Sequence, residues 1–355
     1  MRLMFAYHLM ALRSGTVGSA QDLYAYVQMA KQLGHEVVVY GPPDRDSPFP
    51  FSLDVGAVDA LVFIFEWTTH VRDGDRLDFA RFMAKIPRDR RIVIDCDGAY
   101  NDPISADGDC NHRDAASSRT WTEVCDSLSD KICQPTLRPL RSNVVPFLFY
   151  GFDPKRAEAY EAARAKEYGM MYVGHSKLRW RAMERVLRAI EPVRDEVGRL
   201  AVVGHGWDAL PPWAAAMRME DAFYTDNAYM RQLGVEIFPP IRFEQVIPWM
   251  SKAVLNPVLM RPIFERLQLV TPRLFETVSA STIPLFNMDP EHVRQIYGEE
   301  ATALIMPADR PEQSILEKIR RPERCMELLK GIRAHLSEQH SHARRFKELL
   351  AIVES

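Results

Sequence analysis

Residues 171–187 read MYVGHSKLRWRAMERVL, in which an apolar strand runs through a glycine into an amphipathic helix. The turn between strand and helix is basic. A helix N-terminus presents free backbone N–H groups and the positive end of the helix dipole, and both attract phosphate. We therefore predict a site for a diphosphate at this turn, with a solvated basic turn as the alternative. The residues of the predicted anion site are Gly174, Lys177, Arg179 and Arg181.

Short apolar strands alternate with amphipathic helices on both sides of this stretch. The chain opens with a strand, a small-residue loop, a helix containing Leu23 and Leu33, and a second strand, which together predict a βαβ unit. Most of the strands are continuous apolar runs, which are typical of parallel strands buried on both faces. The sequence therefore predicts an α/β fold. The predicted strands lie at 1–7, 36–40, 60–65, 91–94, 170–173, 200–203, 235–238, 253–255, 283–286 and 303–306.

The length of the chain and one change in its composition predict two domains. With 355 residues, the chain is long enough for about two domains of ordinary size. An apolar run at 144–150 ends in Gly151 and Pro154, a composition that suits a crossing between domains. We therefore expect one α/β domain over residues 1–150 and a second that begins at residue 151.

Composition excludes several classes of protein. The chain is 47% hydrophobic, so it can bury a substantial core, and wholesale disorder is excluded. Its net charge is −3, so the basic footprint of a nucleic-acid-binding protein is absent. Five cysteines in a chain of this length do not make a disulfide framework, and no apolar run is long enough to span a bilayer. The apolar start is too short for a secretory signal, so a cytoplasmic location is expected.

A second candidate site begins at Thr271, where the sequence reads TPRLFETVSASTIPL. Thr271 and Pro272 are typical of a helix cap followed by the first turn. Arg273 and Glu276 are three residues apart, so they share one side of this helix near its start. The pair is either an ordinary ion pair or a site where the carboxylate accepts hydrogen bonds from a ribose diol.

These motifs resemble those of the GT-B nucleotide-sugar glycosyltransferases. RLFETVSASTIPLF at 273–286 is similar to the family motif R-x-F/L-E-x-x-A-x-G-x-P, whose glutamate corresponds to Glu276. The stretch at 171–187, VVGHGW at 202–207 and LGHEV at 33–37 resemble further elements of these enzymes, in the family's order. The R-x-F-E pattern is closest to the spore-maturation-protein-like members. The layout also resembles the phage DNA β-glucosyltransferases.

The chain departs from the family pattern in two places. Gln268 stands where many retaining members have a second glutamate, and the glycine that usually precedes the proline of the motif is missing before Pro284. The departures separate the chain from the best-known subfamily. The presence of Gln268 in place of the glutamate slightly favours an inverting enzyme. The sequence leaves the sugar and the stereochemistry open.

The resemblance implies two Rossmann-like domains that face a central cleft. The domain over 151–335 would bind a nucleoside-diphospho-sugar, with a UDP-sugar as the expected donor, Glu276 on the ribose and Arg273 supporting the diphosphate. The domain over 1–150 would bind the acceptor, and a final helix over 336–355 would pack back on it. Cations and helix N–H groups would stabilise the leaving group, so neither a metal nor a further cofactor is expected.

A third candidate site is RIVIDCDGAYND at 91–102, where a strand ends in Asp95 and Asp97. Carboxylates at the carboxyl end of a strand lie where α/β sheets bind ligands. In the glycosyltransferase interpretation, one aspartate is the base that removes the proton of the acceptor hydroxyl. The string also resembles the D-x-D-G nucleophile motif of haloacid-dehalogenase-like phosphohydrolases, which is an alternative function. Capping of the strand end is the structural alternative.

Smaller signals complete the prediction. Gly15 and Gly18 of the N-terminal loop let a donor or acceptor approach the backbone, although a tight turn explains them equally well. The cysteines and histidines lack the paired spacing of a zinc site. The sequence thus predicts a hexosyltransferase with an unidentified small-molecule, glycan or other hydroxyl acceptor, and nucleic acid is not the expected acceptor. A non-catalytic sugar-nucleotide-binding protein is the remaining alternative.

Overall fold

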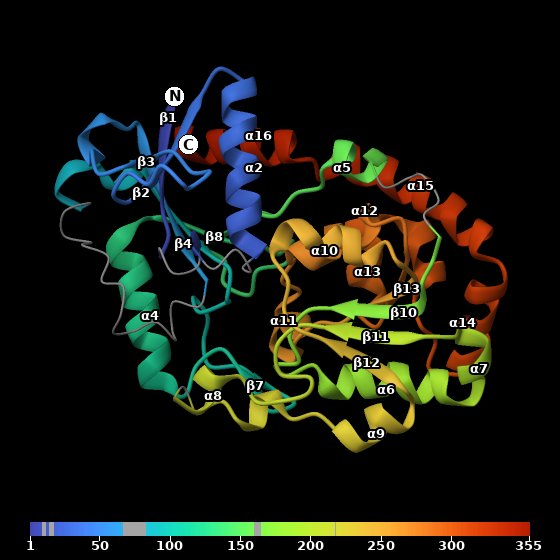
Figure 1. Cartoon of the computed structure of the whole chain (residues 1–355). Helices are drawn as coiled ribbons and strands as arrows, with labels where there is room; N and C mark the ends of the chain where they lie inside the picture. Colours follow the sequence, from blue (N-terminus) through green and yellow to red (C-terminus); the bar gives the residue numbers. More distant parts are fainter. Residues whose placement is uncertain (9–11, 14–17, 67–82, 160–164, 217) are drawn as a thin grey trace.

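The computed structural model describes the whole chain except residues 9–11, 14–17, 67–82, 160–164 and 217. Its strands form two parallel sheets, which lie in two domains side by side (Figure 1). A short antiparallel hairpin, β6 (Ser105–Ala106) and β7 (Asp109–Cys110), lies apart from both sheets. The sequence therefore predicted the α/β class and the parallel strands correctly.

The first sheet has seven parallel strands in the order β3-β2-β1-β4-β5-β8-β9. Alternate residues of its strands pack in opposite directions. Phe5 packs in one core with Tyr26 of α2 (Gly18–Gln32), whereas Met4 packs in a second core with Leu128 of α4 (Ala115–Leu128). Burial on both faces explains the continuous apolar runs of these strands. The strands are β1 (Arg2–Ala6), β2 (Glu36–Tyr40), β3 (Phe51–Ser52), β4 (Ala60–Phe65), β5 (Arg91–Asp95), β8 (Lys131–Gln134) and β9 (Val144–Pro146).

The second sheet has five parallel strands in the order β12-β11-β10-β13-β14. Tyr172 packs in the core that contains Met183 of α6 (Trp180–Ile190), and Val173 packs in the core that contains Ile247 of α10 (Phe243–Met250). The order of the strands reverses beside β10, and ligands bind at the carboxyl ends of strands at such a point. The strands are β10 (Tyr168–Val173), β11 (Leu200–Val203), β12 (Val235–Phe238), β13 (Ala253–Val258) and β14 (Ile283–Phe286).

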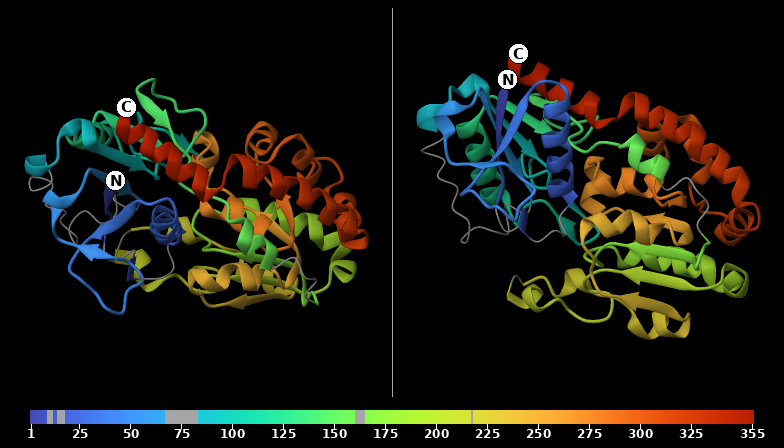
Figure 2. Two further views of the ribbon diagram at one scale, coloured as in Figure 1. Left: turned by 90° about the horizontal axis from the view of Figure 1, so that it is seen from above. Right: turned by 45° about the horizontal axis from the view of Figure 1, so that its top comes forward.

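The last helix returns to the first sheet. After α14 (Pro311–Arg320), helices α15 (Pro322–Gln339) and α16 (His342–Glu354) carry the chain from the second domain back to α2 (Figure 2). His342 Nε2 lies 2.9 Å from Asp22 Oδ1, and Lys131 Nζ donates to the Val353 carbonyl at 2.9 Å. Within the described residues, no helix is both long and apolar enough to cross a membrane. The remaining helices are α5 (Pro154–Ala159), α7 (Arg194–Val197), α8 (Pro212–Ala216), α9 (Asn227–Gln232), α11 (Pro262–Leu267), α12 (Pro272–Ser279) and α13 (Pro290–Tyr297).

One strand prediction was wrong. The apolar run at 303–306 forms the end of a 3₁₀ helix, Glu299–Leu304, and a single bridge between Ile305 and Phe286. The backbone of Met306 still donates to the Phe286 carbonyl at 2.8 Å, so the run borders β14 without extending the sheet. The apolar side chains of this run can pack in the core either as a strand or as a 3₁₀ helix. Composition alone therefore did not distinguish a strand from a 3₁₀ helix.

Candidate functional site

A cavity of about 340 Å³ lies between the two sheets. Its walls come from loops at the carboxyl ends of strands in both domains. The first domain contributes Gly18, Glu66, Cys96, Asp97 and Tyr150. The second domain contributes a cationic part, with His175, Arg179, Arg261, Arg273 and the carboxylate of Glu276, and a less polar part, with His205, Trp213, Ile241, Phe243 and Val246.

Gly174 follows β10, and the backbone around it packs tightly in the cavity wall. A Cβ on the neighbouring Gly204, at the end of β11, would lie 2.4 Å from the Gly174 carbonyl oxygen, a distance that real Cβ atoms do not adopt. The same carbonyl accepts a hydrogen bond from Trp207 Nε1 at 2.7 Å. The two glycines therefore bring the ends of two strands together beneath the basic turn.

Three arginines, Arg179, Arg261 and Arg273, give the cavity a positive side, and His175 lies beside them. Burial and the neighbouring arginines lower the pKa of Arg179, and they lower the pKa of His175 well below its usual value, so His175 is neutral at physiological pH. Arg179 Nη1 lies 3.0 Å from His175 Nδ1. Positive groups that repel one another and are removed from water favour the arrival of an anion. Of the residues predicted for the anion site, Gly174 and Arg179 line the cavity, and Arg261 and Arg273 lie in the same wall.

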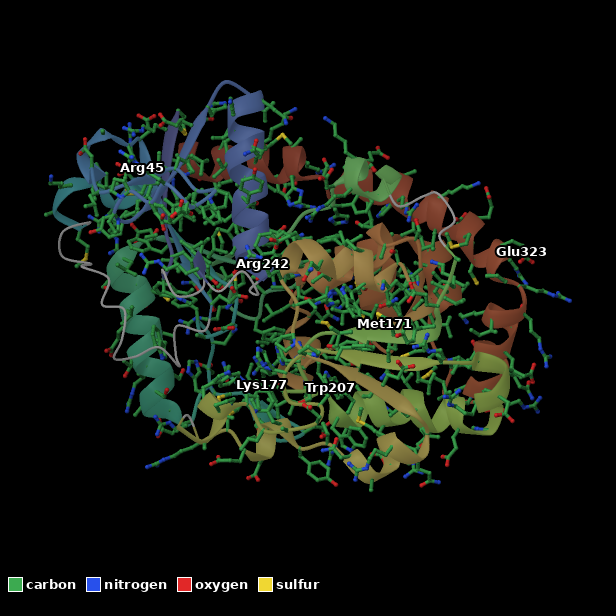
Figure 3. The ribbon with its side chains drawn as sticks, viewed as in Figure 1. Arg45, Met171, Lys177, Trp207, Arg242 and Glu323 are labelled. Atoms are coloured by element: carbon green, nitrogen blue, oxygen red, sulfur yellow. The ribbon has the colours of Figure 1, made fainter. Side chains whose placement is uncertain are left out.

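Lys177 and Arg181 lie outside the cavity wall. Lys177 is buried where the two domains meet (Figure 3), and burial together with Arg261 lowers its pKa to about 7, while Asp97 and Asp109 oppose that shift. Arg181 is exposed and forms an ion pair with Asp107 at 3.2 Å. The structure therefore brings Lys177 close to the carboxylates of the other domain and places Arg181 on the surface.

An ion pair joins the two domains beside the cavity. Arg261 donates from Nη2 to Asp109 Oδ1 at 2.7 Å and from Nε to Oδ2 at 3.2 Å, and the Ile263 backbone N–H also donates to Asp109. The Asp109 side chain is 2% exposed. Sequence reasoning missed both residues. Arg261 stands between a strand and Pro262, which starts a helix, and the basic residues at 171–187 also lie between a strand and a helix. This position could have identified Arg261 as a candidate, but the sequence around Asp109 contains no pattern that predicts its role.

Glu276 is the fifth residue of the eight-residue helix α12 and is buried. Its Oε2 lies 2.9 Å from Arg273 Nη1, so the predicted pair forms an ion pair within the helix. Burial raises the pKa of Glu276, and the charge of Arg273 opposes that rise. When the side-chain amide of Gln21, in α2, is oriented with its nitrogen towards Glu276, it donates to Glu276 Oε1 at 3.2 Å. A residue of the first domain therefore helps to orient this carboxylate.

Asp95 and Asp97 have different environments. Asp95 is fully buried and accepts hydrogen bonds from the backbone of Ala99 and Tyr100, at 3.0 and 2.8 Å, and from Gln134 Nε2 at 2.8 Å. These bonds hold the turn after β5. Asp97 projects from that turn and lines the cavity. Asp95, which the phosphohydrolase alternative requires as nucleophile, lies outside the cavity wall, and its bonds explain it as a structural residue.

The two glycines of the N-terminal loop differ in what the structure describes. Gly15 lies outside the described residues. Gly18 begins α2 and lines the cavity, and a Cβ at this position would lie 2.5 Å from Pro272 Cγ. Gly18 thus permits a close approach between the starts of α2 and α12, which belong to different domains.

Glu66 is a further carboxylate in the cavity wall, and it follows β4. Its Oε2 accepts hydrogen bonds from the hydroxyls of Tyr7 and Ser19, which lie 2.8 Å from each other. Burial raises the pKa of Glu66 to about 7, although the two hydroxyls oppose the rise. Its position after an apolar strand was the only sequence signal, and many surface glutamates share that position.

Comparison with known proteins shows the fold. An α-glucosyltransferase solved with UDP and a 13-mer DNA has a TM-score of 0.66 at 14% identity, covering 100% of this chain and 99% of that chain. T4 phage BGT, solved with its UDP-glucose substrate, has a TM-score of 0.58 at 12% identity and full coverage of both chains. The chain has the GT-B fold. No family model matches the sequence, and no curated protein matches it.

The GT-B fold agrees with the two Rossmann-like domains and central cleft that the motifs predicted. At 11–14% identity the comparisons establish the architecture, and the chemistry is argued from the side chains of this chain. The roles predicted for individual site residues stay predictions.

Proposed function

We propose that the protein is a glycosyltransferase that moves a hexose from a nucleoside-diphospho-sugar to an acceptor hydroxyl. The observation that carries this proposal is the composition of the cavity wall. Arg179, Arg261 and Arg273 converge beside the carboxylate of Glu276 in a cavity that the two domains share. A diphosphate next to a ribose diol satisfies both features, because guanidinium groups bind phosphate oxygens and a carboxylate accepts from hydroxyls.

The less polar part of the cavity provides a place for the nucleobase. Trp213, Ile241, Phe243 and Val246 are close to the cationic part of the same cavity. A base is planar and mostly apolar on its faces, so it gains from contact with aromatic and aliphatic side chains. We propose a uridine diphosphate donor, in line with the UDP and UDP-glucose held by the structures of similar fold.

The reaction requires the acceptor to lose a proton and the diphosphate to leave with a negative charge. The three arginines stabilise that charge as it develops. Such electrostatic stabilisation is usually the largest single contribution to the rate enhancement by an enzyme. We propose that no metal is required, although one structure of similar fold holds UDP and Mn²⁺. Of the two aspartates predicted as the base, Asp97 is the one in the cavity wall.

The acceptor is a hydroxyl compound on the side of the first domain. Structures of similar fold were solved with DNA, including DNA that contains a HMU base. The net charge of −3 disfavours nucleic acid, so we propose a small-molecule or glycan acceptor and include DNA among the compounds to be tested.

Calorimetry with UDP, GDP and dTDP and with their glucose conjugates tests the donor. We expect UDP and UDP-glucose to bind, and a Glu276→Ala variant to bind them at least tenfold more weakly. Glu236→Gln is the matched control, because Glu236 pairs with Arg199 away from the cavity. Lack of binding by every nucleotide would contradict the proposal. Binding without turnover on water, glycans, small hydroxyl compounds or DNA would favour a non-catalytic binding protein.

A further inference from the structure

The cavity contains two carboxylates on the side of the first domain, Glu66 and Asp97, and they belong to neighbouring strands. Glu66 follows β4 and Asp97 lies in the turn after β5, and these two strands pair in the sheet. Both groups therefore face the place where an acceptor meets the donor. Only one of them is needed to accept the proton of the acceptor hydroxyl.

Asp97 has positive charge close by. The charge of Asp97 acts on Lys177, where it opposes the fall in the lysine pKa that burial causes. The interaction is mutual, so the ionised carboxylate of Asp97 is stabilised by the ammonium group when Lys177 is protonated. The carboxylate of Asp97 therefore interacts with a buried lysine of the second domain, whereas that of Glu66 is held by two hydroxyl groups of its own domain.

Glu66 has the opposite environment. Its carboxylate is partly buried and lies among hydroxyl groups and other acids, and the negative charges of Asp97 and Asp22 raise its pKa further. Tyr7 and Ser19 hold its Oε2, so the carboxylate has a fixed orientation in the cavity wall. A general base works best when its pKa lies near the working pH and its position is fixed.

We propose that Glu66 is the catalytic base of the transfer reaction, held in place by the Tyr7 and Ser19 hydroxyls. The inference rests on the proposed glycosyltransferase function. In the step, the acceptor oxygen forms a bond to the anomeric carbon, and the bond from that carbon to the β-phosphate oxygen breaks. The electron pair of the broken bond leaves with the nucleoside diphosphate. The proton of the acceptor hydroxyl passes to the Glu66 carboxylate.

Hydrolysis of UDP-glucose, with water as the acceptor, provides an assay that does not require the natural acceptor. We expect Glu66→Gln to lower the rate of UDP release at least 100-fold. UDP affinity should stay within threefold of the wild type, because the amide keeps the size of the side chain and the nucleotide contacts lie in the other domain. Asp97→Asn is the comparison within the site, and Glu236→Gln is the control outside it.

The pH dependence of the rate distinguishes a base from a residue that only supports the fold. The wild-type rate should fall about tenfold for each pH unit below about 7, as Glu66 gains a proton. Tyr7→Phe and Ser19→Ala each remove a donor that stabilises the ionised carboxylate, so each should move this fall to higher pH. Among the residues that the structure describes, the ionisable or hydroxyl groups around Glu66 include Tyr7, His8, Ser19, Asp22, Cys96, Asp97 and Tyr150.

Three results would overturn the inference. The first is a Glu66→Gln variant that retains the rate within fivefold. The second is an Asp97→Asn variant whose rate is at least 100-fold lower and no longer depends on pH, which would assign the base to Asp97. A fall that only moves to lower pH is expected in this variant, because the charge of Asp97 raises the pKa of Glu66. The third is that the pH at which the rate falls is the same in Tyr7→Phe and Ser19→Ala as in the wild type. This measurement tests the inference even if Glu66→Gln fails to fold. Failure of the wild type to bind UDP or to release it from UDP-glucose would instead contradict the proposed function.

Discussion

Arg261 and Asp109 form a two-pronged ion pair across the domain boundary, with oxygen–nitrogen distances of 2.7 and 3.2 Å. Arg261 also lines the cavity proposed for the diphosphate. One guanidinium therefore has two potential anionic partners, the carboxylate of the other domain and the donor. We therefore expect Arg261 to link the contact between the domains to donor binding.

Asp109→Asn should raise the affinity for UDP about tenfold and lower the thermal stability of the free protein. The change removes a buried negative charge, and breaking a buried pair costs about 3–5 kcal/mol when the other charge stays behind. The unpaired Arg261 then gains more from a bound diphosphate. Calorimetry and thermal denaturation with and without UDP measure both effects.

Asp107→Asn is the matched control for this variant. Asp107 lies in the turn of the same hairpin and pairs with Arg181 at 3.2 Å, but both side chains are well exposed. Exposed pairs contribute about 0–1 kcal/mol, so UDP affinity and stability should stay near those of the wild type. Equal behaviour of the two variants would show that the Arg261–Asp109 pair has no special part in donor binding.

Glu276→Ala should weaken UDP binding by about 10- to 100-fold, because hydrogen bonds to a charged group contribute about 1.5–3 kcal/mol. Glu276→Gln keeps one acceptor oxygen and should lose less. If Glu276 binds the ribose of the donor, the affinity for inorganic pyrophosphate should be nearly unchanged in both variants. A parallel loss of UDP and pyrophosphate affinity would indicate that Glu276 acts mainly by positioning Arg273.

Gly18→Ala should lower turnover of UDP-glucose about tenfold or more and leave the secondary structure intact. The added Cβ would lie 2.5 Å from Pro272 Cγ, so α2 and α12 must move apart where the two domains meet. Gly56→Ala is the control, since its Cβ would have an ordinary contact of 3.5 Å. Turnover by Gly18→Ala equal to that of the control would show that this close approach is not required.

Lys177 should make UDP binding depend on pH. Burial lowers its pKa to about 7, so the free protein loses this proton as pH rises through 7. The protonated form favours the diphosphate, and UDP affinity should therefore fall above pH 7 while binding takes up close to one proton at pH 8. Calorimetry at pH 8 in buffers of different ionisation enthalpy measures the uptake.

Lys177→Met should abolish this proton uptake, whereas Lys330→Met, a change at an exposed position of α15, should retain it. Uptake that is unchanged in Lys177→Met would place the titrating group elsewhere in the cavity. Lys177 would then be a buried residue of the domain boundary with no part in donor binding.

Removal of divalent metal should leave turnover within twofold of its starting value. The positive charge of Arg179, Arg261 and Arg273 is built into the cavity wall and is available to the leaving diphosphate without a metal. Dialysis against EDTA followed by the UDP-glucose assay measures this, with and without added Mn²⁺. A loss greater than tenfold that Mn²⁺ restores would contradict metal independence.

Local features of the chain were predictable from sequence because they depend on near neighbours. The strand at Ala60–Phe65 follows from an unbroken apolar run, and the start of α12 follows from Thr271 and Pro272. Arg273 and Glu276 pair because three residues bring side chains to the same side of a helix. The order of strands and helices along the chain predicted two α/β domains in tandem, and the resemblance of the motifs to those of the GT-B glycosyltransferases implied the GT-B fold.

Contacts between distant parts of the chain were decided only by the tertiary structure. Asp109 and Arg261 are 152 residues apart, and Glu66 is 47 and 59 residues from the two hydroxyls that hold it. Sequence could not separate Asp95 from Asp97 either, because the turn after β5 buries one and directs the other into the cavity. Periodicity and capping are encoded within a few residues, whereas the chemistry of the cavity depends on how the two domains pack against each other.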